Sequence, residues 1–545
     1  GSVYTEGGFV EGVNKKLRLL GSDSVDVFKG IPFATTKTLE NPQHHPGWQG
    51  EDRAAGRQGT GWGDTGQAPG SPPCPTSVSE DLPVMVWIYG GAFRMGSSSD
   101  DGEEIATQGK VIVVTFNYRV STLGFLSTKD ANLPGNYGLR DQHMAIAWVK
   151  RNIEAFGGGP QQHHYFWGIS WRCQRLSTLS PYNKGLIRRA ISQSGVALSP
   201  WAIQHNPLFW AQKVAEKVGC PTDDTARLAK CLKVTDPRAL TLAYHVGPGT
   251  CSLSLPDLIV HYLAFVPVVD GDFIPDDPSN LFSNAADIDY LAGTNSMDGH
   301  LFATVDMPAI DKFYKDISEE DFYWLVSGLT TNKGLEGARA AFAIYTECWA
   351  QDPSQETKKR TVVDLETDVL FLMPTETALA QHRAAAKSAR TCFYQFSLPS
   401  RDPGNPKWLG ANHAAEIASV YGEPFTKPEV YQPQDRTVSK AMIAYWTNFA
   451  HSGDPNAGHS AVPTHWYPYT TENSNYLDIT STLDSSSMKE HLRTKFPQFW
   501  ALTYQALPTV HLQVSPVPLS DDSESPPTPS ADGSQAPQMP IVLGF

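Results

Sequence analysis

Val84-Met-Val-Trp-Ile-Tyr89 and Val111-Ile-Val-Val-Thr-Phe116 are continuous apolar runs rich in β-branched residues. Strands with this pattern are covered on both faces, as the central strands of parallel sheets are. An amphipathic helical pattern from Asp141 to Ile153 follows them and stops at Gly157-Gly-Gly-Pro160. Residues 200–400 are rich in further helical patterns, which we interpret as additions to the same domain. Strands alternating with helices predict βαβ units and an α/β fold.

Tyr89-Gly-Gly-Ala-Phe93 continues directly from the first apolar run. Consecutive small residues after a buried strand let backbone N–H groups face a ligand, as an oxyanion hole requires. A Gly-Gly pair after a strand also forms simple tight turns. The segment therefore indicates catalysis only in combination with a nucleophile and a base.

The last part of the chain differs in composition from the rest. From about Pro508 it is rich in Pro, Ser, Asp, Thr and Gly, and it contains two imperfect copies of one repeat, at Pro516 and Pro527. Such a segment buries too little apolar surface to offset the entropy of an ordered chain. We expect one globular domain over residues 1–507 and an extended tail over residues 508–545.

The charge of the chain excludes some classes of partner. Its 545 residues include 43 Lys and Arg against 57 Asp and Glu, a net charge of −14. This balance does not favour nucleic acid. No apolar run of about 18 residues predicts a transmembrane segment. The chain begins at Gly1 without a charged and apolar leader, so we expect a soluble protein, in its mature form if it is secreted.

Two of the seven cysteines are close in sequence. Cys220 and Cys231 bracket a short segment that a local disulfide could close, and two buried thiols fit the spacing equally well. The others are Cys74, Cys173, Cys251, Cys348 and Cys392. None of them has the spacing of a zinc site, so no metal is predicted.

Several longer motifs resemble one family of enzymes. They are Asn117-Tyr-Arg-Val120, Leu123-Gly-Phe-Leu-Ser127, Gly135-Asn-Tyr-Gly-Leu-Arg-Asp-Gln142, Ala155-Phe-Gly-Gly158, Tyr4-Thr-Glu-Gly-Gly-Phe-Val-Glu-Gly-Val-Asn14, Leu179-Ser-Pro-Tyr-Asn-Lys-Gly185 and Met297-Asp-Gly-His300. The first four are similar to segments of the type B carboxylesterase and cholinesterase family, and the last three to its branch of bile salt-activated lipases. The resemblance covers nearly the whole chain, including the tail, and implies an α/β-hydrolase fold.

That family implies a Ser-Asp-His triad, which we carry over one residue at a time. Asp298, before Gly299, matches the acidic member, although a turn residue would also suit this position. His413, in Gly410-Ala-Asn-His-Ala414, matches the general base. Ser170 occupies the place of the nucleophile. The oxyanion hole would use the N–H groups of Gly91, Ala92 and Trp171.

The nucleophile segment departs from the family pattern. In Phe166-Trp-Gly-Ile-Ser-Trp-Arg172 the first glycine of the expected Gly-x-Ser-x-Gly turn is present, but Arg172 replaces the second. Residues 161–175 are aberrant as a whole, whereas both flanks match the family, and residues 51–78 lack an expected strand and cysteine pair. Either the reported sequence is faulty here or the chain is catalytically impaired. Ser194, in Ser192-Gln-Ser-Gly195, is a rival nucleophile that lacks a glycine two residues before it.

The resemblance also implies function. It predicts a secreted digestive glycoprotein that hydrolyses cholesteryl, acylglycerol and other lipid carboxylic esters at a lipid–water interface, through an acyl-enzyme and with bile salts as activators. Arg401 matches a bile salt-binding arginine of the family, although without the family a solvated surface arginine is the better interpretation. No metal or organic cofactor is implied, and a basic cluster for heparin is not recognisable. The alternative is a catalytically inactive cholinesterase-like binding or adhesion module, which the altered nucleophile segment favours.

Overall fold

The computed structural model describes residues 1–16, 24–48, 51–52, 81–98, 102–159, 165–168, 175–244 and 263–510. Within these ranges the centre of the protein is an eight-stranded sheet in the order β15-β14-β13-β12-β11-β10-β8-β9. The strands are β8 (Val84–Trp87), β9 (Ile112–Thr115), β10 (Tyr165–Gly168), β11 (Arg189–Gln193), β12 (Asp289–Asn295), β13 (Thr391–Phe396), β14 (Tyr476–Ile479) and β15 (Met488–Lys489). Neighbours pair in parallel except β14 and β15.

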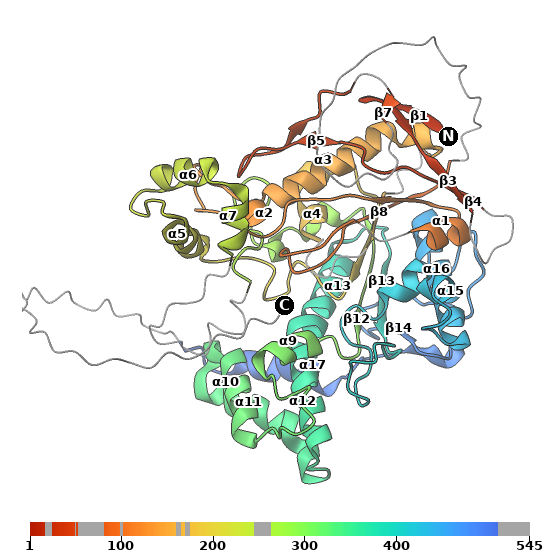
Figure 1. Ribbon diagram of the computed structural model, residues 1–545. Helices are drawn as coiled ribbons and strands as arrows, with labels where there is room; N and C mark the ends of the chain where they lie inside the picture. Colours follow the sequence, from red (N-terminus) through yellow and green to blue (C-terminus); the bar gives the residue numbers. More distant parts are fainter. Residues whose placement is uncertain are drawn as a thin grey trace, which may run out of the picture.

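Helices cover the sheet in two groups, which lie on either side of it in Figure 1. One group consists of α1 (Glu103–Gly109), α14 (Ile417–Tyr421), α15 (Glu423–Thr426) and α16 (Pro433–Ser452). The other consists of α3 (Tyr137–Asn152), α4 (Arg175–Leu179) and α13 (Met373–Ala385). The continuous apolar strands fit this arrangement, because every residue of β8 and of β14 is buried.

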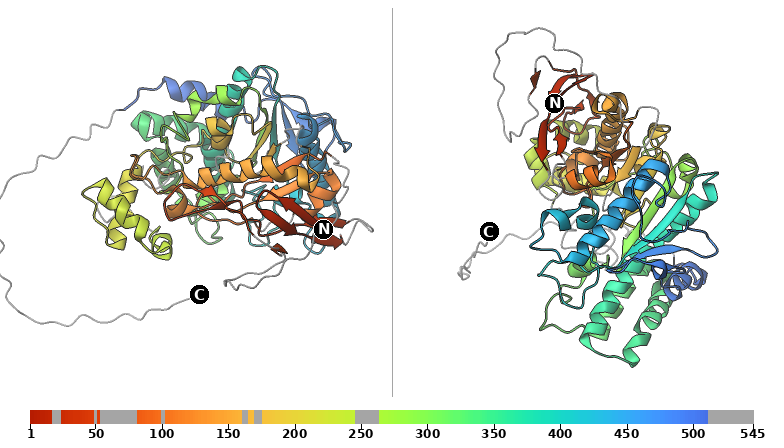
Figure 2. Two further views of the ribbon diagram at one scale, coloured as in Figure 1. Left: turned by 90° about the horizontal axis from the view of Figure 1, so that it is seen from above. Right: turned by 90° about the vertical axis from the view of Figure 1, so that its right-hand side faces the viewer.

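Among the described residues, three smaller sheets form near the N-terminus. The first contains β1 (Ser2–Thr5), β2 (Gly8–Glu11) and β7 (Glu51–Asp52). The second pairs β3 (Val13–Lys16) with β4 (Ser24–Val27), and the third pairs β5 (Ala34–Thr35) with β6 (Gln43–His44). Figure 2 shows these strands, in red, beside α3 rather than within the central sheet. They extend the domain without contributing to its carboxyl edge.

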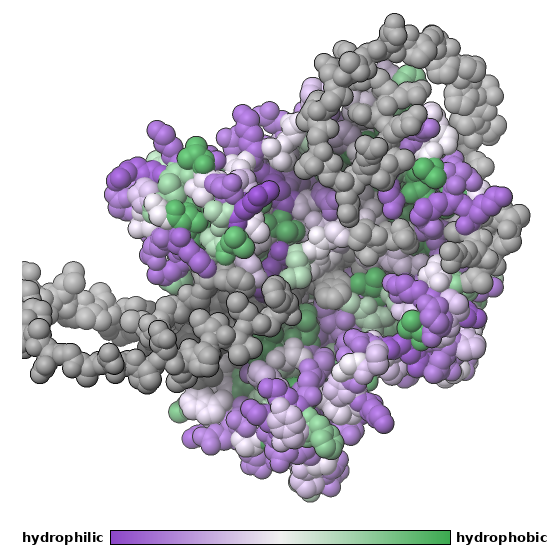
Figure 3. Space-filling view, in the orientation of Figure 1, coloured by the Kyte–Doolittle hydropathy of each residue, from purple (hydrophilic) through white to green (hydrophobic). Residues whose placement is uncertain are grey.

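Two helical lobes extend from the sheet. The first contains α5 (Pro207–Val218), α6 (Thr225–Val234) and α7 (Pro237–Leu242), near α2 (Ser121–Phe125). The second contains α9 (His300–Asp306), α10 (Glu319–Leu329), α11 (Gly334–Thr346), α12 (Gln355–Thr367), α17 (Lys495–Gln498) and α18 (Tyr504–Ala506), and it has a hydrophobic core of its own. The outward surfaces of both lobes are mostly hydrophilic, with scattered hydrophobic residues (Figure 3).

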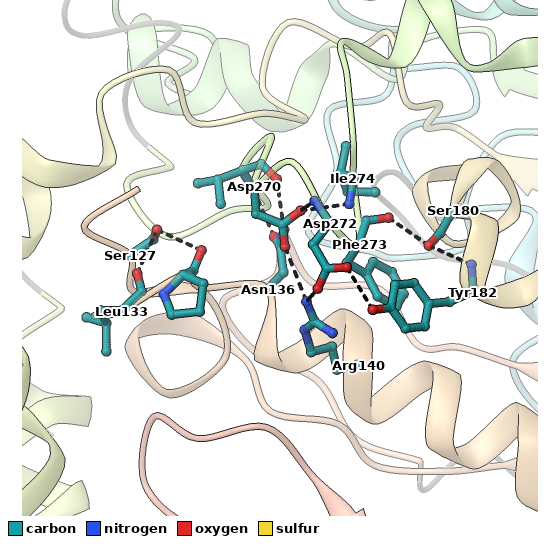
Figure 4. A network of polar contacts seen from close by, with 12 residues as sticks. Ser127, Leu133, Asn136, Arg140, Ser180, Tyr182, Asp270, Asp272, Phe273 and Ile274 are labelled. Carbon is teal, nitrogen blue, oxygen red and sulfur yellow. Dashed lines mark hydrogen bonds and ion pairs between the residues drawn. The ribbon is translucent and has the colours of Figure 1, made fainter. Parts of the chain in front are cut away.

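Polar contacts with neighbouring loops hold α3 in place. Arg119 donates from Nε and Nη2 to the two carboxylate oxygens of Asp141, each at 2.7 Å. At the start of α3, the Asn136 side chain donates to the Val268 carbonyl and accepts the Val268 N–H. Farther along α3, Arg140 forms an ion pair with Asp272. The segment from Val268 to Asp272 is therefore held against the first turns of the helix (Figure 4). Several family motifs therefore have a structural role.

The structure confirms the α/β-hydrolase fold that the sequence predicts. The runs at residues 84–89 and 111–116 form β8 and β9, and the pattern from Asp141 belongs to α3, which begins at Tyr137. Among the described residues, no helix has the length and apolar character needed to cross a membrane. The tail beyond residue 510 lies outside the described residues.

A disulfide joins Cys220 to Cys231 with their Cα atoms 5.8 Å apart, so the first of the two interpretations of this pair is confirmed. The bond ties the end of α5 to α6 within the first lobe. Cys348 and Cys392 are free thiols. The remaining cysteines, Cys74, Cys173 and Cys251, lie outside the described residues.

Candidate active site

Asp298 and His413 meet at the carboxyl edge of the sheet, although 115 positions separate them in sequence. The imidazole Nδ1 lies 2.7 Å from Asp298 Oδ1, and both side chains are buried. The second carboxylate oxygen, Oδ2, accepts the backbone N–H of Asn295 at 2.7 Å. Asp298 is thus held on both sides, and it fixes the orientation of the ring so that Nε2 faces away from it.

Two loops are joined to create this contact. The turn after β12 and the loop that carries His413 form a parallel bridge between Met297 and Asn412. The Met297 N–H donates to the Ala411 carbonyl at 2.9 Å, and Asn295 Nδ2 donates to the Asn412 carbonyl at 2.8 Å. The geometry therefore depends on backbone contacts that hold both loops as one unit.

A buried polar chain supports these loops from behind. Glu416 is fully buried and accepts from Gln193 Nε2 at 3.0 Å and from Asn295 Nδ2 at 2.5 Å. Trp446 Nε1 donates to Gln193 Oε1 at 2.7 Å. Burial raises the pKa of Glu416, and the neighbouring Asp298 carboxylate raises it further. The sequence analysis missed these residues. Their only local signal is that Glu416 follows His413 by three residues and Gln193 precedes Ser194.

Aromatic side chains shield the pair from water. The Phe371 ring centroid lies 5.1 Å from that of His413. Trp201 and Phe302 pack against Phe371 in turn, with centroids 6.0 and 5.9 Å away. A low local polarity strengthens the contact between imidazole and carboxylate.

Gly91 and Ala92 lie beyond the carboxyl end of β8 with positive φ angles of 111° and 65°. A Cβ atom on Gly91 would lie 2.0 Å from the Met95 carbonyl oxygen, so only glycine fits there. Within the described residues, neither N–H donates to an acceptor. Tyr89 and Tyr118 fix the start of this turn, because each hydroxyl donates to the other residue's carbonyl at 2.9 Å. The turn offers backbone donors, as an oxyanion hole needs.

The predicted nucleophile Ser170 and its neighbour Trp171 lie outside the described residues. Strand β10, which ends at Gly168 two positions before Ser170, lies between β8 and β11. The rival serine, Ser194, directly follows β11 with a φ of 54°. Its hydroxyl is buried and has no hydrogen-bond partner among the described residues. The Ser194 hydroxyl therefore makes no hydrogen bond to His413.

Arg401 is not a free surface cation. Its Nε and Nη2 donate to the two oxygens of the buried Asp435 at 2.9 and 2.7 Å. Asp435 also accepts the Gln432 N–H at the start of α16, so it anchors this helix. A pocket of about 180 Å³ adjoins the pair, and Ala414 and Ala415, next to His413 in sequence, also line it.

No group of three or more His, Cys, Asp or Glu side chains in the described ranges is arranged to hold a metal ion. The absence of a cofactor stays a prediction.

The fold is that of an α/β-hydrolase, and the buried contact between His413 and Asp298 has the geometry that the base and the acid of a serine-hydrolase triad need. The carboxylesterase family model matches residues 1–500, and the chain belongs to this family. Bile salt-activated lipase of Rattus norvegicus is 66% identical over 97% of this chain and 89% of its own length. The Homo sapiens protein of that name is 66% identical over 95% of this chain and 71% of its own length. Neuroligin-3 of Mus musculus is 36% identical over 69% of this chain and 45% of its own length. These relatives confirm the resemblance predicted from the motifs.

Proposed function

We propose that this chain is a serine esterase that hydrolyses lipid carboxylic esters through an acyl-enzyme and is stimulated by bile salts. The observation that carries the proposal is the 2.7 Å contact between His413 Nδ1 and Asp298 Oδ1 at the carboxyl edge of the sheet. The names of the relatives with about two thirds identity support the substrate class and the activator. Secretion is part of the same proposal.

Each residue has a distinct role in this mechanism. Ser170 attacks the ester carbonyl while His413 Nε2 removes its proton, and Asp298 stabilises the imidazolium that forms. The N–H groups of Gly91, Ala92 and Trp171 bind the oxyanion of the tetrahedral intermediate. His413 then protonates the leaving alcohol, and water repeats the sequence on the acyl-enzyme.

The bile salt site is proposed at Arg401. With Nε and Nη2 engaged by Asp435, Nη1 is the nitrogen left to pair with a carboxylate or sulfonate. The adjoining pocket would receive apolar parts of the same molecule. Arg401→Ala should weaken activation by taurocholate and leave hydrolysis of a soluble ester without bile salt largely unchanged.

Labelling with an organophosphonate followed by peptide mass spectrometry tests the nucleophile. We expect one labelled serine between Phe156 and Gly185, with label and nitrophenyl ester hydrolysis both lost in Ser170→Ala. A peptide that reads as printed and carries no label would instead support the binding module, which Arg172 in the glycine position favours.

A further inference from the structure

The loop between α9 and α10 exposes two adjacent aromatic side chains. Phe313 is 101% exposed and Tyr314 is 79% exposed, and Phe313 is the most exposed large hydrophobic residue in the described part of the chain. Lys312 and Lys315 flank them and form no ion pair with any described residue. An aromatic pair between two lysines without ion pairs therefore projects from a lobe whose other exposed hydrophobic residues are scattered.

The loop is held firmly despite its exposure. Ile310 and Ile317 are buried at its two ends. The Lys315 N–H donates to the Lys312 carbonyl at 3.2 Å, which closes a turn with Phe313 and Tyr314 at its two central positions. Lys359 Nζ donates to the same carbonyl at 2.8 Å from α12.

A second contact links the loop to the active site. The His300 ring lies 2.8 Å from Asp311 Oδ1, and His300 begins α9 only two residues after Asp298. The aromatic turn therefore has a fixed position relative to the acidic member of the proposed triad. Figure 1 shows α9 between the carboxyl edge of the sheet and the outer helices of this lobe.

Packing inside the protein does not explain the pair, because neither ring contacts another ring of the described chain. Aromatic residues flanked by lysines suit a lipid surface, where rings settle among the headgroups and ammonium groups reach the phosphates. Asp316 and Glu319 lie close in sequence and the chain is acidic overall, so a strongly anionic surface is disfavoured.

We propose that Phe313 and Tyr314 dock this enzyme onto a zwitterionic lipid surface. The proposal rests on the proposed function, because a lipid esterase must reach substrate held in an aggregate. Insertion of the two rings would hold the lobe, and through α9 the active site, against the layer that contains the ester.

The test measures binding of the full chain to vesicles of ether-linked phosphatidylcholine, which contains no carboxylic ester to hydrolyse. We expect Phe313→Ser/Tyr314→Ser to lower the partition coefficient about tenfold or more. Val234→Ser/Leu242→Ser is the matched control, because it removes two apolar side chains, 83% and 72% exposed, from the other lobe. The control should change binding less than about twofold.

Two further measurements separate the alternatives. Hydrolysis of a soluble nitrophenyl ester should be equal in all these proteins, and Phe313→Trp should keep vesicle binding, which excludes misfolding as the cause. Equal binding by the loop variant and the wild type would overturn the docking proposal. Conversion of a dimer to a monomer by the loop variant, with unchanged partition, would overturn it in favour of a contact between copies. Because Ser170→Ala should bind vesicles normally, failure of the esterase proposal would be distinguishable.

Discussion

Glu416→Gln should impair the active site although Glu416 does not touch the substrate in the proposed mechanism. The two carboxylate oxygens accept N–H groups from Gln193 and Asn295. A glutamine at 416 would direct its own NH₂ group at one of these donors. Gln193 cannot rotate its amide to compensate, because its oxygen already accepts from Trp446. At least one hydrogen bond to a charged group is then lost, which costs about 1.5–3 kcal/mol of unfolding free energy.

The same change should reach Asp298, because the backbone of Asn295 donates to it. A shift of a fraction of an ångström in Asn295 misplaces the Asp298 carboxylate, and we expect kcat on a soluble ester to fall about 10- to 100-fold with little change in KM. Urea unfolding and steady-state hydrolysis measure the two effects separately.

Glu366→Gln is the matched control. Glu366 is also fully buried, but neither of its oxygens has a hydrogen-bond partner among the described residues, and burial raises its pKa well above the usual range. Replacing it removes an unpartnered carboxyl, so the unfolding free energy should rise or stay unchanged at neutral pH. Equal behaviour of the two variants, in stability and in kcat, would refute the argument.

Three further predictions concern charge, pH and the disulfide. Asp298→Asn should lower kcat about 10⁴-fold. One side-chain oxygen must keep accepting the Asn295 N–H, so the amide NH₂ would face Nδ1 of His413 and stabilise the wrong tautomer of the ring. Steady-state hydrolysis of a soluble ester measures this loss. Burial raises the pKa of Asp306 from 3.8 to about 7, so the folded state holds a proton that the unfolded state releases, and stability should fall as pH rises from about 4 through 7. Asp306→Asn should reduce the difference in stability between pH 5 and 8 in urea unfolding, while Glu366 and the other buried carboxyls keep the rest of it. Reduction of the bond between Cys220 and Cys231 should destabilise its lobe by about 3 kcal/mol, seen in thermal unfolding with and without reductant.

The sequence predicts the central architecture because its signals are local. Val84 to Tyr89 is apolar at every position, and a strand buried on both faces needs no more information than that. The helix containing Asp141 was equally visible, but its start at Tyr137 was not. Asn136 adopts a left-handed conformation there and bonds to Val268, which is 132 positions away.

The site shows the limit of local reasoning more clearly. Asp298 and His413 were assigned through family motifs, whereas the residues that hold them, Glu416 and Gln193, come from a loop and a strand more than 200 positions apart. The sequence could not show that Arg401 is paired with Asp435 either, because an exposed and a paired arginine have the same local pattern. Pairing between polar groups far apart in sequence cannot be predicted from local patterns, because it depends on how the fold places them.

The energetics of the Asp298 and His413 pair bear on the choice between enzyme and binding module. Burying a carboxylate against an imidazole gives little net stability, since desolvation offsets the attraction. A further fully buried carboxyl, that of Glu416, behind the pair adds to this cost. A surface used only for binding gains nothing from such an arrangement, whereas a general base needs a carboxylate that orients its imidazole and stabilises the imidazolium. The contact between His413 and Asp298 therefore supports the proposed catalysis.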